Sequence, residues 1–171
     1  MRWLLLEEVY SIRKGEKAVA FAKVPRAPYS SEVLFIEMMA QTGGLLVGAE
    51  SDYQKDLIFA KIENATITKI PKSGTPLQIE AWSESLGAEG GWLEATITCA
   101  EGLVARAKLL LMAVSGLSAE QTKSITFHEA FMDYFNIRKK ILPPAREAER
   151  GSSILQNKIE GRPITQGDQP S

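Results

Sequence analysis

The sequence predicts an α+β fold in which one antiparallel sheet wraps a long buried helix. Residues 33–47 form an apolar segment with almost no polar face, which is typical of a helix that is buried on all sides. Two segments before it and about four after it alternate between apolar and polar residues, as strands with one covered face do. Short stretches rich in Gly, Pro and polar residues separate these segments.

The first two predicted strands form a hairpin before the helix. Residues 4–12 alternate loosely and form the first strand, and residues 14–16 (Lys-Gly-Glu) are a turn signal. Residues 18–24 form the returning strand, with Val19 and Phe21 on one of its faces. This part of the chain therefore places two neighbouring strands directly before the helix.

The start of the helix carries the expected signals. Pro25 and Pro28 break the chain into a loop after the second strand. Ser30 or Ser31 can cap the first turn of the helix, because a hydroxyl oxygen accepts from its free N–H groups. Glu32 in that first turn suits the positive end of the helix dipole.

Two polar residues inside the apolar helix mark a candidate site. Glu37 and Gln41 are four residues apart and so share one face. A buried carboxylate costs several kcal/mol unless a partner compensates it, so Glu37 needs a functional or structural reason. The apolar segment has about 15 residues, fewer than the roughly 20 that span a bilayer. Gly43 and Gly44 predict a close approach of the helix to another backbone.

The chain after the helix predicts the rest of the sheet. Four segments have the alternation or apolar run of strands, and turn signals separate them; they cover residues 57–70, 77–86, 92–100 and 103–114. The helix is more apolar than one sheet can cover. We therefore expect its far side to meet a second subunit.

The C-terminal third predicts an extension to the domain. Residues 1–114 contain the helix and the sheet, residues 115–142 have helical spacing, and residues 143–171 are polar and rich in Gly, Pro and Gln, which favours a disordered tail. Three phenylalanines in the extension are expected to seal a sheet edge or a dimer groove: Phe127, Phe131 and Phe135.

The composition excludes several classes of function. A formal net charge of −1 gives no reason to expect a nucleic-acid or membrane partner. Cys99 is the single cysteine, which excludes an internal disulfide, and His128 is the single histidine, which argues against a multi-histidine metal site. The apolar run at the start ends at Leu6 and acids follow at once, so the segment does not fit a signal peptide. We expect a cytoplasmic protein.

Two stretches carry a resemblance to a known family. The first is Pro25-x-x-Pro28 followed by VLFIEMMAQTGG at residues 33–44, and the second is IFAKIENATITKIPKSGTP at residues 58–76. Over roughly residues 4–114 the chain resembles the FabA/FabZ-type 3-hydroxyacyl-acyl-carrier-protein dehydratases. The resemblance implies a hotdog fold, a dimer or a multiple of dimers, a substrate carried on acyl carrier protein or CoA, and no metal or organic cofactor.

The resemblance also implies a site. In that family a histidine from one chain removes the C2 proton and an acid from the other helps the 3-hydroxyl leave as water. It places Glu37 at the acid, Lys23 at the position of the histidine, and Glu32 at a glycine whose backbone N–H helps hold the thioester oxygen. The substrate arm enters a tunnel along the helix. The residues expected to bind the substrate are Val33, Phe35, Met38, Met39 and Gln41.

Each candidate residue also has an alternative role. Glu37 is either an active-site acid or a carboxylate paired with Lys23 or with backbone N–H groups. Lys23 acts as a base only if burial removes its proton; otherwise it is a structural or surface residue. His128, brought in by the C-terminal extension, is an alternative base.

Three functions follow from these residues. The first is dehydration of 3-hydroxyacyl thioesters to trans-2-enoyl thioesters. The second is a non-catalytic subunit that completes a site with a histidine-bearing hotdog paralogue. The third is an acyl-thioester hydrolase in which Glu37 activates water.

Overall fold

The computed structural model describes residues 4–26, 28–114 and 129–143. Within them the elements follow in the order β1 (Glu8–Arg13), β2 (Lys17–Lys23), α1 (Ser31–Glu50), β3 (Asp56–Ile67), β4 (Pro76–Gly87), β5 (Gly90–Cys99), β6 (Gly102–Val114), α2 (Glu129–Tyr134), α3 (Ile137–Lys140) and β7 (Ile141–Leu142). The predicted order of strands and helix is confirmed. The first strand begins at Glu8, and Leu5 and Leu6 before it pack against the core outside the strand.

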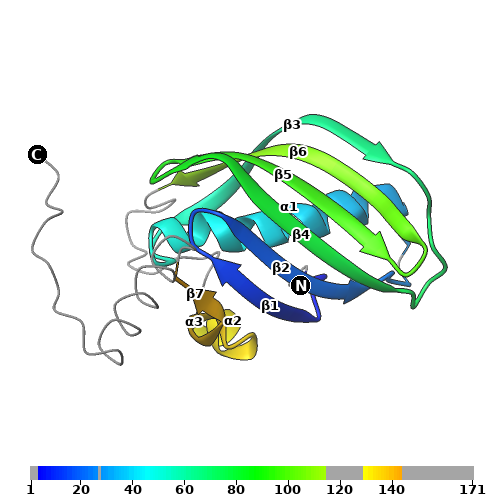
Figure 1. The fold of residues 1–171 in the computed structure, drawn as a ribbon, viewed down its shortest axis with the longest axis horizontal. Helices are drawn as coiled ribbons and strands as arrows, with labels where there is room; N and C mark the ends of the chain where they lie inside the picture. Colours follow the sequence, from blue (N-terminus) through cyan, green and yellow to red (C-terminus); the bar gives the residue numbers. More distant parts are fainter. Residues whose placement is uncertain (1–3, 27, 115–128, 144–171) are drawn as a thin grey trace, which may run out of the picture.

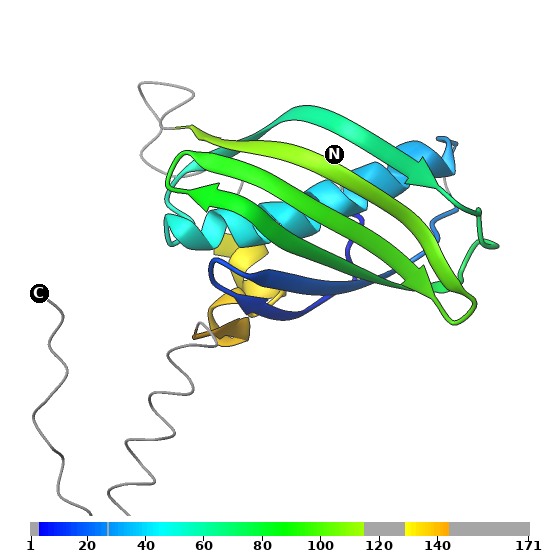
Figure 2. The ribbon, with the colours of Figure 1, turned by 45° about the horizontal axis from the view of Figure 1, so that its top comes forward.

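A single sheet wraps α1 (Figures 1 and 2), with the strand order β3-β6-β5-β4-β2-β1-β7. Strands β1 to β6 pair antiparallel with their neighbours, and α1 contacts every one of them. The predicted α+β class is confirmed. The sheet is not wholly antiparallel, because the seventh strand, β7, pairs parallel to β1.

Residue size decides how closely the sheet approaches α1. In β5 the buried residues Leu93, Ala95 and Ile97 alternate with half-buried ones, as the period of two predicts. In β2 the buried face is made of alanines at positions 18, 20 and 22, whereas Val19 and Phe21 lie on the outer face of the sheet, away from α1. The small alanine side chains leave room for the helix.

The structure extends α1 beyond its predicted length. Ser30 caps the helix by accepting from the N–H of Val33 at 3.4 Å, which confirms one of the two predicted caps. The helix then runs for 20 residues, so the expectation of about 15 residues was wrong. By length and composition alone α1 could cross a membrane, but 67% of its most apolar 18-residue window is buried. Burial inside the sheet accounts for its apolar character.

Tyr53 closes the C-terminal end of α1. Its N–H donates to the carbonyl of Gly48 at 2.8 Å and its hydroxyl donates to the carbonyl of Leu45 at 3.1 Å. Gly48 is among the last four residues of the helix, whose carbonyls lack intrahelical partners, and Leu45 lies one turn before it. Burial, and secondarily the charge of Asp52, raise the pKa of Tyr53.

We expect Tyr53→Phe to lower the free energy of unfolding by about 1 kcal/mol at neutral pH, because one hydrogen bond is lost. Since folding raises the tyrosine pKa, its contribution is complete below the ordinary value of about 10 and declines above it. Urea denaturation of both proteins should give a constant difference from about pH 7 to 9 and a shrinking one above about pH 10. A difference that stays constant at high pH would contradict this account.

The described part of the C-terminal extension joins the core at the β1 edge. α2 and α3 are separated at Asn136, whose φ is 52°, and the chain then pairs with β1 as β7. The helical spacing predicted as far as Leu142 is therefore wrong in its last two residues, which belong to a strand. The rings of Phe131 and Phe135 meet edge to face at 5.2 Å. At the β1 edge of the sheet it is β7 that pairs, so the sealing role expected of the phenylalanines stays a prediction. Its buried residues are Met132, Phe135 and Ile137. Phe127 and His128 lie outside the described residues.

Candidate functional site

Glu37 and Gln41 form the centre of the candidate site, on one face of α1. The amide Nε2 of Gln41 donates to Oε1 of Glu37 at 2.9 Å. The amide Oε1 of Gln41 accepts the backbone N–H of Leu5 at 3.0 Å. A carboxylate, an amide and a backbone N–H thus form a directed chain of hydrogen bonds from the N-terminal segment to the helix.

The stripe of α1 around Glu37 is the part of the helix that its own sheet leaves uncovered. Val33 is 55% exposed, and Ile36, Glu37 and Gln41 are half-buried, whereas the later turns are buried almost completely. We expected the far side of the helix to meet a second subunit. Only this N-terminal stripe leaves α1 surface for such a contact. A few polar groups beside apolar surface are typical of a small-molecule binding site.

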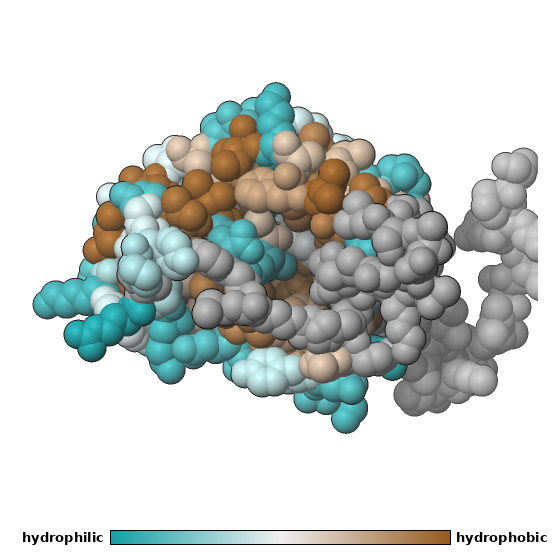
Figure 3. Space-filling model, turned by 180° about the vertical axis from the view of Figure 1, so that it is seen from behind, coloured by the Kyte–Doolittle hydropathy of each residue, from teal (hydrophilic) through white to brown (hydrophobic). Residues whose placement is uncertain are grey.

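β3 adds exposed apolar residues at the edge of the sheet. Phe59 and Ile62 are 41% and 42% exposed. They pair with the buried residues Leu111 and Leu109 of β6, so they face the same side of the sheet as α1. Figure 3 shows apolar side chains gathered on the side of the molecule where β3 runs.

The predicted lining residues fall into two groups. Phe35, Met38 and Met39 are fully buried among core residues under the sheet. Val33 lies on the surface and Gln41 beside Glu37. Binding of an acyl chain by the three buried residues stays a prediction, and it would require the core to open around them.

Lys23 lies apart from Glu37. As the last residue of β2 it points to the outer face, since Ala22 and Val24 on either side of it are buried. Its Nζ is 3.2 Å from Oε2 of Glu7, and both side chains are more than half exposed. Within one chain Lys23 therefore pairs with Glu7, and Glu37 accepts from Gln41. A pair between Lys23 of one chain and Glu37 of another stays a prediction. A catalytic role for Lys23 stays a prediction that its position does not favour.

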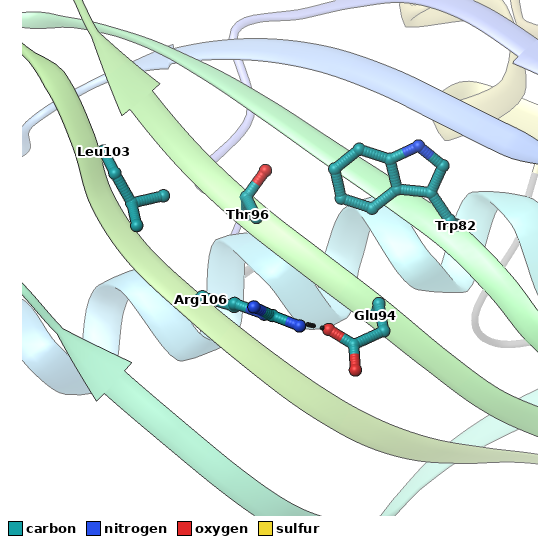
Figure 4. A pocket seen from close by; sticks show the side chains of 5 residues that line it. All are labelled: Trp82, Glu94, Thr96, Leu103 and Arg106. Carbon is teal, nitrogen blue, oxygen red and sulfur yellow. Dashed lines mark hydrogen bonds and ion pairs between the residues drawn. The ribbon is translucent and has the colours of Figure 1, made fainter.

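A shallow pocket of about 490 Å³ lies on the outer face of the sheet (Figure 4). Trp82 and Leu103 flank Thr96 in it, and Arg106 Nε pairs with Glu94 Oε2 at 3.1 Å. These residues alternate with the buried residues that face α1. The pocket and the Glu37 site are thus on opposite faces of the sheet.

The described ranges, which exclude His128, hold no cluster of three His, Cys, Asp or Glu side chains that could bind a metal ion. The role of His128 stays a prediction.

Two features of the site were missed in the sequence. Leu5 contributes a backbone N–H, which no side-chain pattern reveals. Phe59 and Ile62 were assigned to a strand without being recognised as exposed on the side of α1. The second feature has a simple cause. A strand at a sheet edge has one neighbour instead of two, so more of its side chains stay exposed.

The fold has relatives among solved structures. One is a hypothetical thioesterase with coenzyme A from Streptococcus pneumoniae TIGR4, with a TM-score of 0.52, 18% identity, and coverage of 65% of this chain and 88% of that one. The dehydratase heterocomplex ApeI:P from Xenorhabdus doucetiae has a TM-score of 0.52, 19% identity and coverage of 66% and 84%. A protein from Streptococcus mutans UA159 bound to acetyl CoA has a TM-score of 0.52, 16% identity and coverage of 67% and 93%.

Sequence comparison adds no relative. No protein-family model matches the chain, and no curated protein matches it significantly in sequence. The structural likenesses, at 16% to 19% identity, establish the architecture alone. This chain has the hotdog fold, in which a sheet wraps a central helix as it does in thioesterases and dehydratases.

Proposed function

We propose that this protein hydrolyses acyl thioesters and that Glu37 is its general base. One observation carries the proposal: Glu37 is half-buried on the uncovered stripe of α1 and accepts a hydrogen bond from a neutral amide. In the described part of the chain no Lys, Arg or His pairs with it. Hydrolysis needs one base to activate water, so a single carboxylate is sufficient. The likeness to a thioesterase supports this reaction class.

The reaction balances with Glu37 as the proton carrier. Its carboxylate takes a proton from water while the water oxygen attacks the thioester carbonyl carbon. The tetrahedral intermediate then collapses, and the carbon–sulfur bond breaks. The thiolate leaves and receives the proton from Glu37, which regenerates the carboxylate. The products are a carboxylic acid and a free thiol.

The proposed substrates are CoA thioesters, with acyl carrier protein as the alternative carrier. Solved structures of the same fold hold coenzyme A or acetyl CoA, which supports the first choice. Apolar residues that are exposed or half-buried suit an acyl chain: Val33 and Ile36 lie on α1 near Glu37, and Phe59 and Ile62 lie on the side of β3 that faces α1.

We also propose that two chains associate along β3. In the part of the chain that the structure describes, this 12-residue strand lies at the end of the strand order next to β6, so residues 58–67 can pair with a second chain along their other edge. Pairing with a second β3 would extend the sheet and cover Phe59 and Ile62 on the side that faces α1. The partner is a second copy or a hotdog paralogue, and the likeness to a heterocomplex supports the latter.

Association along β3 predicts a change of mass in a double variant. Phe59→Lys with Ile62→Lys should convert a dimer into a monomer at micromolar concentration, because four like charges would meet across the interface. Light scattering after size exclusion measures the mass. Leu103→Lys is the matched control, since Leu103 is also 42% exposed but lies on the outer face. If the control dissociates and the double variant does not, the interface lies on the outer face.

Dehydration of 3-hydroxyacyl thioesters is the second candidate. The resemblance at residues 33–44 and the likeness to the dehydratase heterocomplex favour it. Removing the C2 proton and protonating the 3-hydroxyl are usually the work of two groups. Glu37 supplies one of them, so the other would come from a partner chain that carries a histidine. On this hypothesis the isolated chain is inactive.

One experiment separates the candidates. The purified protein is incubated with acyl-CoA and with 3-hydroxyacyl-CoA, and free thiol and enoyl product are quantified. Thiol release from both substrates supports hydrolysis. Enoyl product without thiol release would establish a dehydratase and overturn the proposal. If the folded protein forms neither product, the result would favour the hypothesis that this chain is a subunit that is inactive without a partner chain.

A further inference from the structure

We infer that the backbone N–H of Leu5 is a positioning group for Glu37 and acts through Gln41. The inference rests on the proposed role of Glu37 and adds to it a contribution from the N-terminal segment. Leu5 and Gln41 are 36 residues apart in sequence. The hydrogen bond between them therefore ties the segment before β1 to the middle of α1.

The Leu5 N–H determines which way the Gln41 amide faces. A backbone N–H can only donate, so the atom opposite it must be the amide oxygen. The amide NH₂ then points the other way, and it lies 2.9 Å from Oε1 of Glu37. A carboxylate oxygen accepts hydrogen bonds, so this orientation gives Glu37 a donor. With the amide reversed, two oxygens would face each other and Glu37 would lose its donor.

The segment that holds Leu5 is anchored in the core and on β2. Leu6 is 4% exposed in the core, and the N–H of Glu7 donates to the carbonyl of Phe21 at 2.9 Å. Regular pairing with β2 begins only at Glu8. The Leu5 N–H is thus outside the sheet ladder and directed at the helix, so its loss removes no strand pairing.

The first test uses hydrogen exchange and needs no enzymatic activity. The Leu5 amide should be protected in the wild-type protein and exchange about threefold to tenfold faster in Gln41→Leu, because one hydrogen bond is lost. The amide of Glu7 is the internal control, since its acceptor is Phe21 and should not change. Equal exchange of the Leu5 amide in both proteins would overturn the inference, whatever reaction the protein catalyses.

The second test separates positioning from structural support. Leu5→Pro removes the N–H and should lower kcat about tenfold or more while KM stays constant, since the base is misplaced but the binding surface is intact. Leu4→Pro is the matched control: it stiffens the same segment and keeps the Leu5 N–H. In a Gln41→Leu background Leu5→Pro should have no further effect. An equal loss of kcat in both backgrounds would show a merely structural role.

A wild-type protein without hydrolase activity would refute the proposed function, and the exchange measurement would still decide the inference.

Discussion

Glu37→Gln should lower the kcat for thioester hydrolysis by about 10²- to 10⁴-fold, the usual contribution of a general base. The substitution keeps the size of the side chain and an oxygen that can still accept from Gln41 Nε2, which lies 2.9 Å from Glu37. It removes only the ability to take a proton from water. KM should change little, because the apolar surface beside the site is unaltered.

Two controls make the Glu37 result specific. Glu101→Gln removes a carboxylate whose side chain is 81% exposed in the turn before β6, and it should leave turnover unchanged. Lys23→Ala tests the position of the family histidine, and we expect less than about a twofold change, because Lys23 pairs with Glu7 on the outer face.

Free-thiol release measured over a range of substrate concentrations gives both kcat and KM. If Glu37→Gln keeps full activity while folding normally, another group activates water. If Lys23→Ala loses as much as Glu37→Gln, the two residues work together across two chains, and the dehydratase-like arrangement is favoured.

The fold was predictable because its signals are local and repeated. Strand alternation marks which residues of β5 are buried, and an apolar segment without a polar face marks α1. The serine cap and the prolines before it locate the start of that helix. The ends of elements were less predictable: the length of α1 and the two residues of β7 depend on packing against distant segments.

Glu37 of the candidate site could be singled out from the sequence, whereas its hydrogen-bond partners could be predicted only in part. A carboxylate in an apolar helix costs energy without compensation, so Glu37 stands out in the sequence. Its neighbour Gln41 follows from helical spacing. The donor that orients Gln41 is a backbone group of Leu5, and every residue except proline has one. The direction of Lys23 depends on which face of β2 is buried, and there the alanines face the core although Val19 and Phe21 are larger.

Gly43→Val should lower the free energy of unfolding by about 3 kcal/mol, and Gly44→Ala should raise it by about 0.5–1 kcal/mol. A Cβ at Gly43 would lie 2.7 Å from Leu93 Cδ1 and 3.3 Å from Leu111 Cδ1. Both leucines are buried in β5 and β6, so neither can move without disturbing the core. A Cβ at Gly44 would lie 3.5 Å from Leu57 Cδ1, an ordinary contact.

The opposite signs expected at two adjacent glycines separate packing from backbone effects. Replacing either glycine reduces the freedom of the unfolded chain and improves helix propensity, which favours folding in both cases. Only Gly43 adds a clash between α1 and the sheet, so only there should stability fall. Urea denaturation of the wild type and of the two variants measures both changes in the free energy of unfolding. If both variants are more stable than the wild type, Leu93 has room to move, and α1 lies less tightly against β5 than the geometry indicates.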